Sequence, residues 1–260
     1  MNKYIPSISN PWDSAKIQFV LRRLGFGCSL MDISTYSNYT PEETIDSIID
    51  NAKSLEVTPA PEWADWDNKT FNSSGNNKAY YHTIMQKQAL SDMIINGFRE
   101  RLSLFWSNHF VVEYLDVNQP AYLYKYYKLI QENCLGNFKT FVHKIGLTPA
   151  MLMYLNGYQN KKNSPNENYA RELYELFTLG EGNGYSQQDI VETARALTGF
   201  TKTKTYMGEI EFNENTYDNG SKTIFGQTGS WGYNDVVDIL FQEKKDFIAD
   251  FICSKIYCYF

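Results

Sequence analysis

The hydrophobic positions of this chain recur mostly at the spacing of α-helices. Apolar residues three and four positions apart, preceded by capping residues and followed by glycines, predict amphipathic helices along most of the sequence. Gly97 is expected to kink or divide the longest of them. The predicted helices cover residues 14–24, 41–49, 80–109, 120–135, 138–145, 149–155, 166–179, 186–198, 234–241 and 246–259. We therefore expect a mainly α-helical, multi-helix globular bundle.

Two segments depart from this helical pattern. Within residues 201–230, apolar and polar positions alternate at 204–207 and 209–212 on either side of Gly208, which predicts a small β-hairpin insert, and the stretch 219–230 that follows is rich in turn residues. Because an isolated hairpin is barely stable in water, we expect it to pack on the helices. Residues 56–78 are rich in proline, asparagine, serine and glycine, and this composition predicts a long, mobile loop. Residues 1–260 are then expected to form a single helical domain.

The charge and apolar content exclude several classes of protein. The chain has 24 Lys and Arg against 30 Asp and Glu, a net charge of −6, and we find no basic stripe, so no nucleic-acid partner is expected. No apolar run approaches the roughly 20 residues of a membrane-spanning helix. Residues 1–11 are polar, so no signal peptide is visible; the protein is either cytoplasmic or has lost its signal. The scattered cysteines are expected to be buried, reduced thiols.

Aromatic residues make up 16% of the chain, a share that suits either helix packing or a surface on which flat ligands stack. Phe105, Trp106, Tyr169 and Phe177 fall on helix faces that we expect to be buried. A stacking surface is therefore to be sought among the remaining aromatic residues, namely Trp63, Trp66, Tyr122, Tyr124, Tyr126 and Tyr127.

The densest group of charged positions lies on the predicted helix 166–179. At 100° per residue, Tyr169, Leu173 and Leu176 form an apolar stripe, and the polar residues gather opposite it. Such a face could hold a metal through paired glutamates or position one carboxylate as an acid or base. It could equally be an ion-pair ladder, which we favour because the Glu-x-x-His spacing of di-metal bundles is missing. The residues of this face are Asn166, Glu167, Asn168, Arg171, Glu172 and Glu175.

His109 ends an aromatic segment, Phe-Trp-Ser-Asn-His-Phe, at residues 105–110. It shares a helix face with Phe105 and Trp106, so we interpret it as a buried, hydrogen-bonded core histidine. It would gain a catalytic interpretation only if the fold placed it near Glu167 or Glu172.

Two further polar groups follow along the chain. Glu192 and Arg195 are three residues apart on one predicted helix, and we expect Arg195 to pair as well with the glutamates of the preceding helix. Asp218 and Lys222 form the charged pair of a loop whose composition is typical of a binding segment. The order Gly-x-x-x-x-Gly-Lys of a phosphate loop is absent, and no strong metal or nucleotide motif occurs. The cofactor and any bound metal therefore stay undetermined.

Several of these segments together resemble a bacterial family of uncharacterised proteins, the domain-of-unknown-function family 1800. The Asn-Glu-Asn-Tyr-Ala-Arg-Glu-Leu motif that begins at Asn166 is the most specific of them. The other similar segments are residues 19–27, 105–110, 136–138 and 194–200, with Asp218, Gly220, Lys222 and Gly226 of the later loop.

The resemblance carries expectations of its own. Members of the family are longer, which implies that this chain corresponds to their amino-terminal part. Many members bear export signals, which implies a periplasmic or extracellular location. The chain departs from the family at Tyr217, where members often have histidine, and at Ser107, where they often have a first histidine before His109. A metal site built on those two histidines would be incomplete here.

Two classes of function fit these observations. The first is a helical scaffold or interaction module of the bacterial envelope or exterior that binds a protein or glycan partner. The second is a metal-assisted or carboxylate-based enzyme, a hydrolase or oxidoreductase. Its catalytic residues would be His109, Glu167, Glu172 and Glu175, and its binding residues Asn166, Asn168, Arg171, Arg195, Asp218 and Lys222. The sequence leaves the oligomeric state open.

Overall fold

The computed structural model describes residues 4–202 and 210–260, and it confirms a mainly α-helical fold. The first half of the chain contains α1 (Ser14–Leu24), α2 (Leu30–Tyr36), α3 (Pro41–Ser54), α4 (Asn68–Ser73), α5 (Lys78–Asn96), α6 (Phe98–His109), α7 (Tyr114–Val117) and α8 (Pro120–Asn133). The second half contains α9 (Phe138–Ile145), α10 (Pro149–Tyr154), α11 (Asn168–Glu172), α12 (Gln187–Ala196), α13 (Tyr233–Glu243) and α14 (Lys245–Tyr259).

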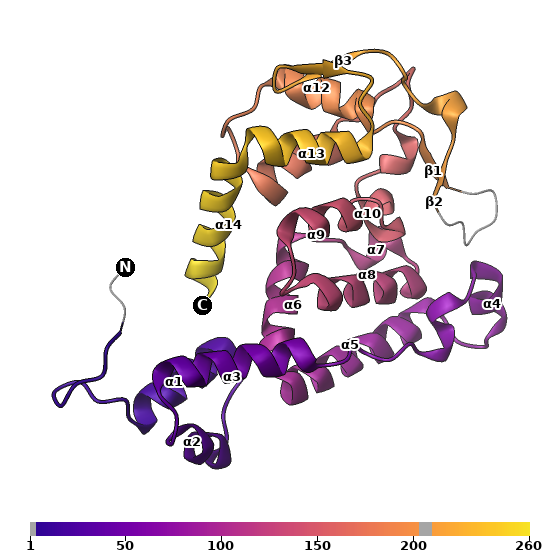
Figure 1. The fold of residues 1–260 in the computed structure, drawn as a ribbon. Coiled ribbons are helices and arrows are strands. Elements are labelled where there is room, and N and C mark those ends of the chain that lie inside the picture. Colours follow the sequence, from indigo (N-terminus) through magenta and orange to yellow (C-terminus); the bar gives the residue numbers. More distant parts are fainter. Residues whose placement is uncertain (1–3, 203–209) are drawn as a thin grey trace.

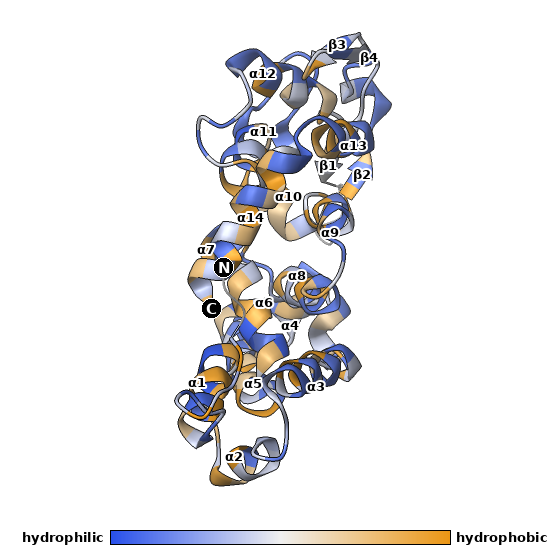
Figure 2. Ribbon diagram, turned by 60° about the vertical axis from the view of Figure 1, so that its left-hand side comes forward, coloured by the Kyte–Doolittle hydropathy of each residue, from blue (hydrophilic) through white to orange (hydrophobic). Residues whose placement is uncertain are grey.

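The helices are arranged along one long direction of the molecule (Figure 1). α1, α2, α3 and α5 lie at one end, α6, α8, α9 and α10 in the middle, and α12 and α13 at the other end. α14 runs back from α13 toward the middle. Most helices have one hydrophobic and one hydrophilic face (Figure 2), as the periodic pattern predicts.

Local sequence signals account for the helix boundaries. Thr40 and Glu43 form a capping box at the start of α3, with Pro41 in the first helical position. Gly97 divides α5 from α6 and has φ 54°, a conformation that is costly for residues with a Cβ. The predicted division of helix 80–109 at Gly97 is therefore confirmed.

Two hydrophobic clusters form the core. The larger one joins α6 and α8–α14 and includes fully buried residues such as Phe110 and Tyr174. The smaller one is aromatic, with the ring of Trp63 centred 6.0 Å from Tyr81 and 6.1 Å from Tyr124. Trp63 and Tyr124, expected to contribute to a stacking surface, are 6% and 4% exposed and serve mainly as core residues.

The predicted helix 166–179 changes its winding halfway along. After α11 the backbone forms a π-helix, η3 (Leu173–Thr178), in which the amide of Leu179 donates to the carbonyl of Tyr174, five residues earlier. Leu176, which α-helical winding places on the apolar stripe with Tyr169 and Leu173, is 48% exposed. Phe177 is buried, as predicted.

The described residues contain two small antiparallel hairpins rather than one. β1 (Phe200–Lys202) pairs with β2 (Ile210–Phe212), so a small hairpin is present here, although the predicted first strand at residues 204–207 and the turn at Gly208 lie outside the described residues. β3 (Lys222–Ile224) pairs with β4 (Gln227–Gly229) in a stretch that the sequence indicated only as turns.

The predicted loop 56–78 contains a 3₁₀ turn, η1 (Glu62–Asp65), and the short helix α4. Trp63 on η1 and Phe71 on α4 are both buried, so the segment is anchored by aromatic side chains. Its mobility stays a prediction. Within the described part of the chain, no helix is both long and apolar enough to cross a bilayer.

Candidate functional site

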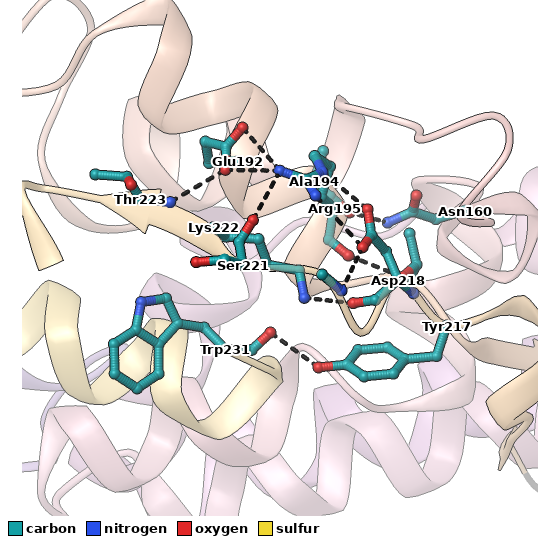
Figure 3. A network of polar contacts seen from close by, with 12 residues as sticks. Asn160, Glu192, Ala194, Arg195, Tyr217, Asp218, Ser221, Lys222, Thr223 and Trp231 are labelled. Atoms are coloured by element: carbon teal, nitrogen blue, oxygen red, sulfur yellow. Dashed lines mark hydrogen bonds and ion pairs between the residues drawn. The ribbon is translucent and has the colours of Figure 1, made fainter. Parts of the chain in front are cut away.

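Arg195, near the end of α12, is the centre of a dense polar network (Figure 3). Its Nε lies 2.8 Å from Oδ2 of Asp218, and its Nη1 lies 2.9 Å from Oε2 of Glu192. Nη1 also donates to the carbonyl oxygen of Ser221 at 3.2 Å. We call these four residues the Arg195 clamp. One planar guanidinium thus joins its own helix to two points of the segment 213–232.

Side chains of the α12 region also bind backbone amides of the segment 213–232. The hydroxyl of Thr198 accepts from the amide of Asp218 at 2.8 Å, and a carboxylate oxygen of Glu192 accepts from the amide of Thr223 at 3.1 Å. Further along, the amide of Phe225 donates to Asp189 at 2.8 Å. These bonds give backbone amides of the segment side-chain partners on α12 and directly after it.

Lys222 is buried beside the Arg195 clamp. Only 1% of the residue is exposed, and its ammonium group donates to the carbonyl oxygen of Asp218. The ammonium also lies 4.9 Å from the centre of the Tyr217 ring, a cation–π geometry. Desolvation lowers the pKa of Lys222, and the negative charge of Asp218 partly offsets this. The predicted charged pair Asp218–Lys222 therefore exists, but its contact runs through a backbone carbonyl.

The prediction for the partners of Arg195 was wrong in one respect. Arg195 pairs with Glu192, as predicted, but its second carboxylate comes from Asp218 and not from the glutamates of the preceding helix. Asparagines tie the two helices instead, since Asn160 donates to the carbonyl of Ala194 at 2.8 Å and accepts from the amide of Asn166 at 2.9 Å. Asn160 was missed because nothing in its local pattern indicated a buried position.

The ladder Glu167–Arg171–Glu175 is confirmed. Arg171 lies 2.9 Å from Glu167 and 3.2 Å from Glu175, and Gln187 at the start of α12 donates to Glu167 at 2.9 Å. The Arg171 side chain is 39% exposed, so this ladder lies on the surface. Asn168 donates its backbone amide to the side chain of Asn166 at 2.9 Å. These contacts account for most of the polar face predicted on helix 166–179.

Glu172 differs from the other acids of this face. Its Oε2 is buried and has no hydrogen-bond partner among the described residues. Desolvation raises the pKa of Glu172, the neighbouring charge of Glu175 raises it further, and Arg171 opposes the shift. A carboxyl group in this position is easier to protonate than an ordinary surface glutamate.

His109 is a buried core histidine, as predicted. The residue is 5% exposed, and its Nε2 lies 2.9 Å from the carbonyl oxygen of Phe177 in the π-helix. Because a carbonyl only accepts, Nε2 carries the proton and Nδ1 is left as a buried acceptor without a partner among the described residues. Desolvation and the charge of Lys255 lower the pKa of His109 to about 3, against the opposing bond to Phe177, so the ring is neutral at pH 7.

The predicted catalytic residues do not form a common metal site. In the described parts of the chain, no three His, Cys, Asp or Glu residues are grouped closely enough to hold a metal ion. Glu167 and Glu175 are joined to each other through Arg171, and His109 binds a backbone carbonyl. Among the predicted catalytic residues, Glu172 and His109 each keep one buried side-chain atom, Oε2 and Nδ1, without a hydrogen-bond partner in the described chain.

Comparisons with known proteins agree with the resemblance noted from the sequence. A family model described as a protein of unknown function, DUF1800, matches residues 19–260. The matched range includes the Arg195 clamp, the ladder of α11 and His109. Searches of curated proteins and of solved structures found no match. Because the model covers nearly the whole chain, the protein belongs to the DUF1800 family.

Proposed function

We propose that this protein is a helical scaffold or interaction module that binds a protein or glycan partner in the bacterial envelope or outside the cell. The observation that carries the proposal is the Arg195 clamp. Its charged groups bind one another and fix the segment 213–232 onto α12. Charges engaged in this way contribute to architecture, and they are poorly placed to accept or donate protons during a reaction.

The location and the class of partner are inferred from separate observations. The tendency of similar sequences to carry export signals favours the envelope or the exterior. The net charge of −6 disfavours a nucleic-acid partner, since most non-specific affinity for nucleic acids comes from positive charge. A protein or a glycan is the remaining class of macromolecular partner.

The alternative is a hydrolase or oxidoreductase that uses a carboxylate, and Glu172 favours it. A buried carboxyl with a raised pKa is a common feature of catalytic acids and bases. His109, whose buried Nδ1 has no hydrogen-bond partner among the described residues, is the second group that such an enzyme could use.

The two functions are separated by one set of measurements on Glu172→Gln, with Glu181→Gln on the exposed loop after η3 as the matched control. If the protein is an interaction module, we expect no stoichiometric metal in protein purified without chelator, and no hydrolysis of a panel of chromogenic esters and glycosides. We also expect an unchanged Tm with EDTA. One equivalent of metal, or turnover, that is lost in Glu172→Gln and kept in Glu181→Gln would establish the enzyme instead.

A further inference from the structure

A cavity of about 320 Å³ lies between the segment that follows α3 and the helices α5 and α8. This volume is within the range of small-molecule sites. The cavity is bounded by Trp63 of η1, by Met85 and Gln88 of α5, and by Tyr124 and Tyr127 of α8. Gln88 is exposed, so the cavity opens to the solvent on that side. In both views α5 and α8 lie away from α12 and β3 (Figures 1 and 2), so this is a place separate from the Arg195 clamp.

The aromatic walls of the cavity are held in place by the fold. The ring of Trp63 meets that of Tyr124 edge to face, with an interplanar angle of 79°. The hydroxyl of Tyr124 donates to the carbonyl oxygen of Thr58 at 3.0 Å, which fixes the segment 56–63 against α8. Tyr127 lies one helical turn after Tyr124. A ligand would therefore meet a preformed wall and would not need to order it.

The polar atoms of the cavity wall are backed by buried carboxylates. Gln88 donates to Asp92 at 2.8 Å, and the hydroxyl of Tyr127 donates to Glu100. Asp92 is 7% exposed and Glu100 is fully buried, and Thr58 also donates to Asp92 at 2.6 Å. Each carboxylate thus lies one hydrogen bond behind the wall of the cavity.

The charges behind the wall do not cancel. Arg99 pairs with Glu100 at 2.5 Å, and its Nη1 donates to the backbone carbonyls of Leu55 and Glu56. Asp92 accepts hydrogen bonds from the neutral side chains of Thr58 and Gln88. Two carboxylates and one guanidinium leave one excess negative charge within the protein interior, where water screens it weakly. The field of this group therefore makes the cavity attractive to a cation.

We propose that this cavity binds a small organic cation with a quaternary or alkylated ammonium group. Aromatic rings attract such cations, and Tyr127 is the least buried of the three aromatic residues that line the cavity. The apolar residues of the wall accommodate the methyl groups. A compact inorganic cation prefers carboxylate ligands in the wall itself, and the residues that line the cavity include no Asp or Glu. A free cation fits better than a phosphocholine headgroup, because the adjacent phosphate would meet the same excess negative charge.

The test is calorimetric titration of the full chain at constant ionic strength with choline, with glycerophosphocholine, and with 3,3-dimethylbutan-1-ol, the neutral isostere of choline. We expect one saturable site for choline and at least tenfold weaker binding of the isostere. Glycerophosphocholine should also bind more weakly than choline. Equal binding of choline and the isostere, or no saturation by 20 mM choline, would overturn the proposal.

Three variants test whether choline binds in this cavity. Tyr127→Leu removes a wall, Asp92→Asn removes the excess charge without changing the shape, and Tyr80→Leu, an exposed tyrosine of α5, is the control. We expect the first two variants to weaken choline binding at least tenfold and the control to leave it unchanged. If circular dichroism shows that either variant is misfolded, the site is located instead by NMR, from the amide chemical-shift changes that choline causes in the wild-type protein. These changes must concentrate in residues 58–63, 85–89 and 124–127, and changes elsewhere would refute the site.

Discussion

Replacing Arg195 by glutamine is expected to destabilise the protein strongly. Glutamine keeps some of the packing but removes the charge that binds Asp218 at 2.8 Å and Glu192 at 2.9 Å. The side chains of Arg195, Asp218 and Glu192 are 27%, 17% and 12% exposed, so the two carboxylates would be left partly desolvated and without their cation. Breaking a buried pair costs about 3–5 kcal/mol, and the partial exposure here reduces the expected loss to about 2–4 kcal/mol.

Arg171→Gln is the matched control, because Arg171 also joins two carboxylates on a helix. Its side chain is 39% exposed, and Glu167 and Glu175 are 37% and 23% exposed, so water screens both pairs more than it screens those of the clamp. Exposed pairs of this kind contribute about 0.2–1 kcal/mol. Urea denaturation followed by circular dichroism measures both losses, with an unchanged m-value as the check on two-state unfolding. Equal losses in the two variants, or a loss below about 1 kcal/mol in Arg195→Gln, would refute the view that burial of the clamp stabilises the fold.

Three further predictions follow from single buried groups. Gly146→Ala places a methyl group against the buried hydroxyl of Tyr169, so the free energy of unfolding measured in urea should fall by at least about 2 kcal/mol. In the control Gly27→Ala, where the added methyl group meets open space, it should change by less than about 0.5 kcal/mol. The pKa of His109 is about 3 in the folded state, below its ordinary value of 6.5. Its contribution to stability is therefore complete above pH 6.5 and is lost as the pH falls toward 3, by about 1.4 kcal/mol per pH unit. The free energy of unfolding should therefore differ less between pH 7 and pH 4.5 in His109→Gln than in the wild-type protein. Burial raises the pKa of the Cys134 thiol to about 11, so in an Ellman titration this thiol should react only after unfolding, whereas the two exposed thiols of α14 react in the native protein.

Each of these has a clear contrary result. A Gly146→Ala variant as stable as the wild type would mean that the tyrosine rings move aside at little cost. An identical pH dependence in His109→Gln would show that other groups carry the acid sensitivity. Reaction of Cys134 in the folded protein would indicate opening of α8, and the exposure of the α14 thiols already departs from the expectation that all cysteines are buried.

The helix boundaries could be predicted from the sequence, whereas the winding of helix 166–179 and the second hairpin could not. Helix boundaries depend on capping residues and glycines within a few positions, so Thr40 and Gly97 could be interpreted from the sequence alone. The π-helix at Leu173–Thr178 was not predictable, since its apolar spacing also fits an α-helix and packing decides the winding. The hairpin β3–β4 was missed because three-residue strands give too short an alternation to detect.

The candidate site was predictable only where partners are close in sequence. The ladder of Arg171 and the pair Glu192–Arg195 follow from helical spacing alone. Asp218 meets Arg195 across 23 residues, and this contact depends on the path of the intervening segment. The same limit applies to the cavity beside Tyr127, since its walls come from three separate segments of the chain.

Hydrogen–deuterium exchange of the segment 213–232 tests most directly whether the Arg195 clamp holds that segment in place. The amides of Asp218 and Thr223 are bound by Thr198 and Glu192, so they should exchange slowly in the wild-type protein and rapidly in Arg195→Gln. The amide of Phe225, bound by Asp189, is independent of Arg195 and should keep its protection in both. Rapid exchange at 218 and 223 in the wild type, or unchanged protection in the variant, would contradict the structural role assigned to the clamp.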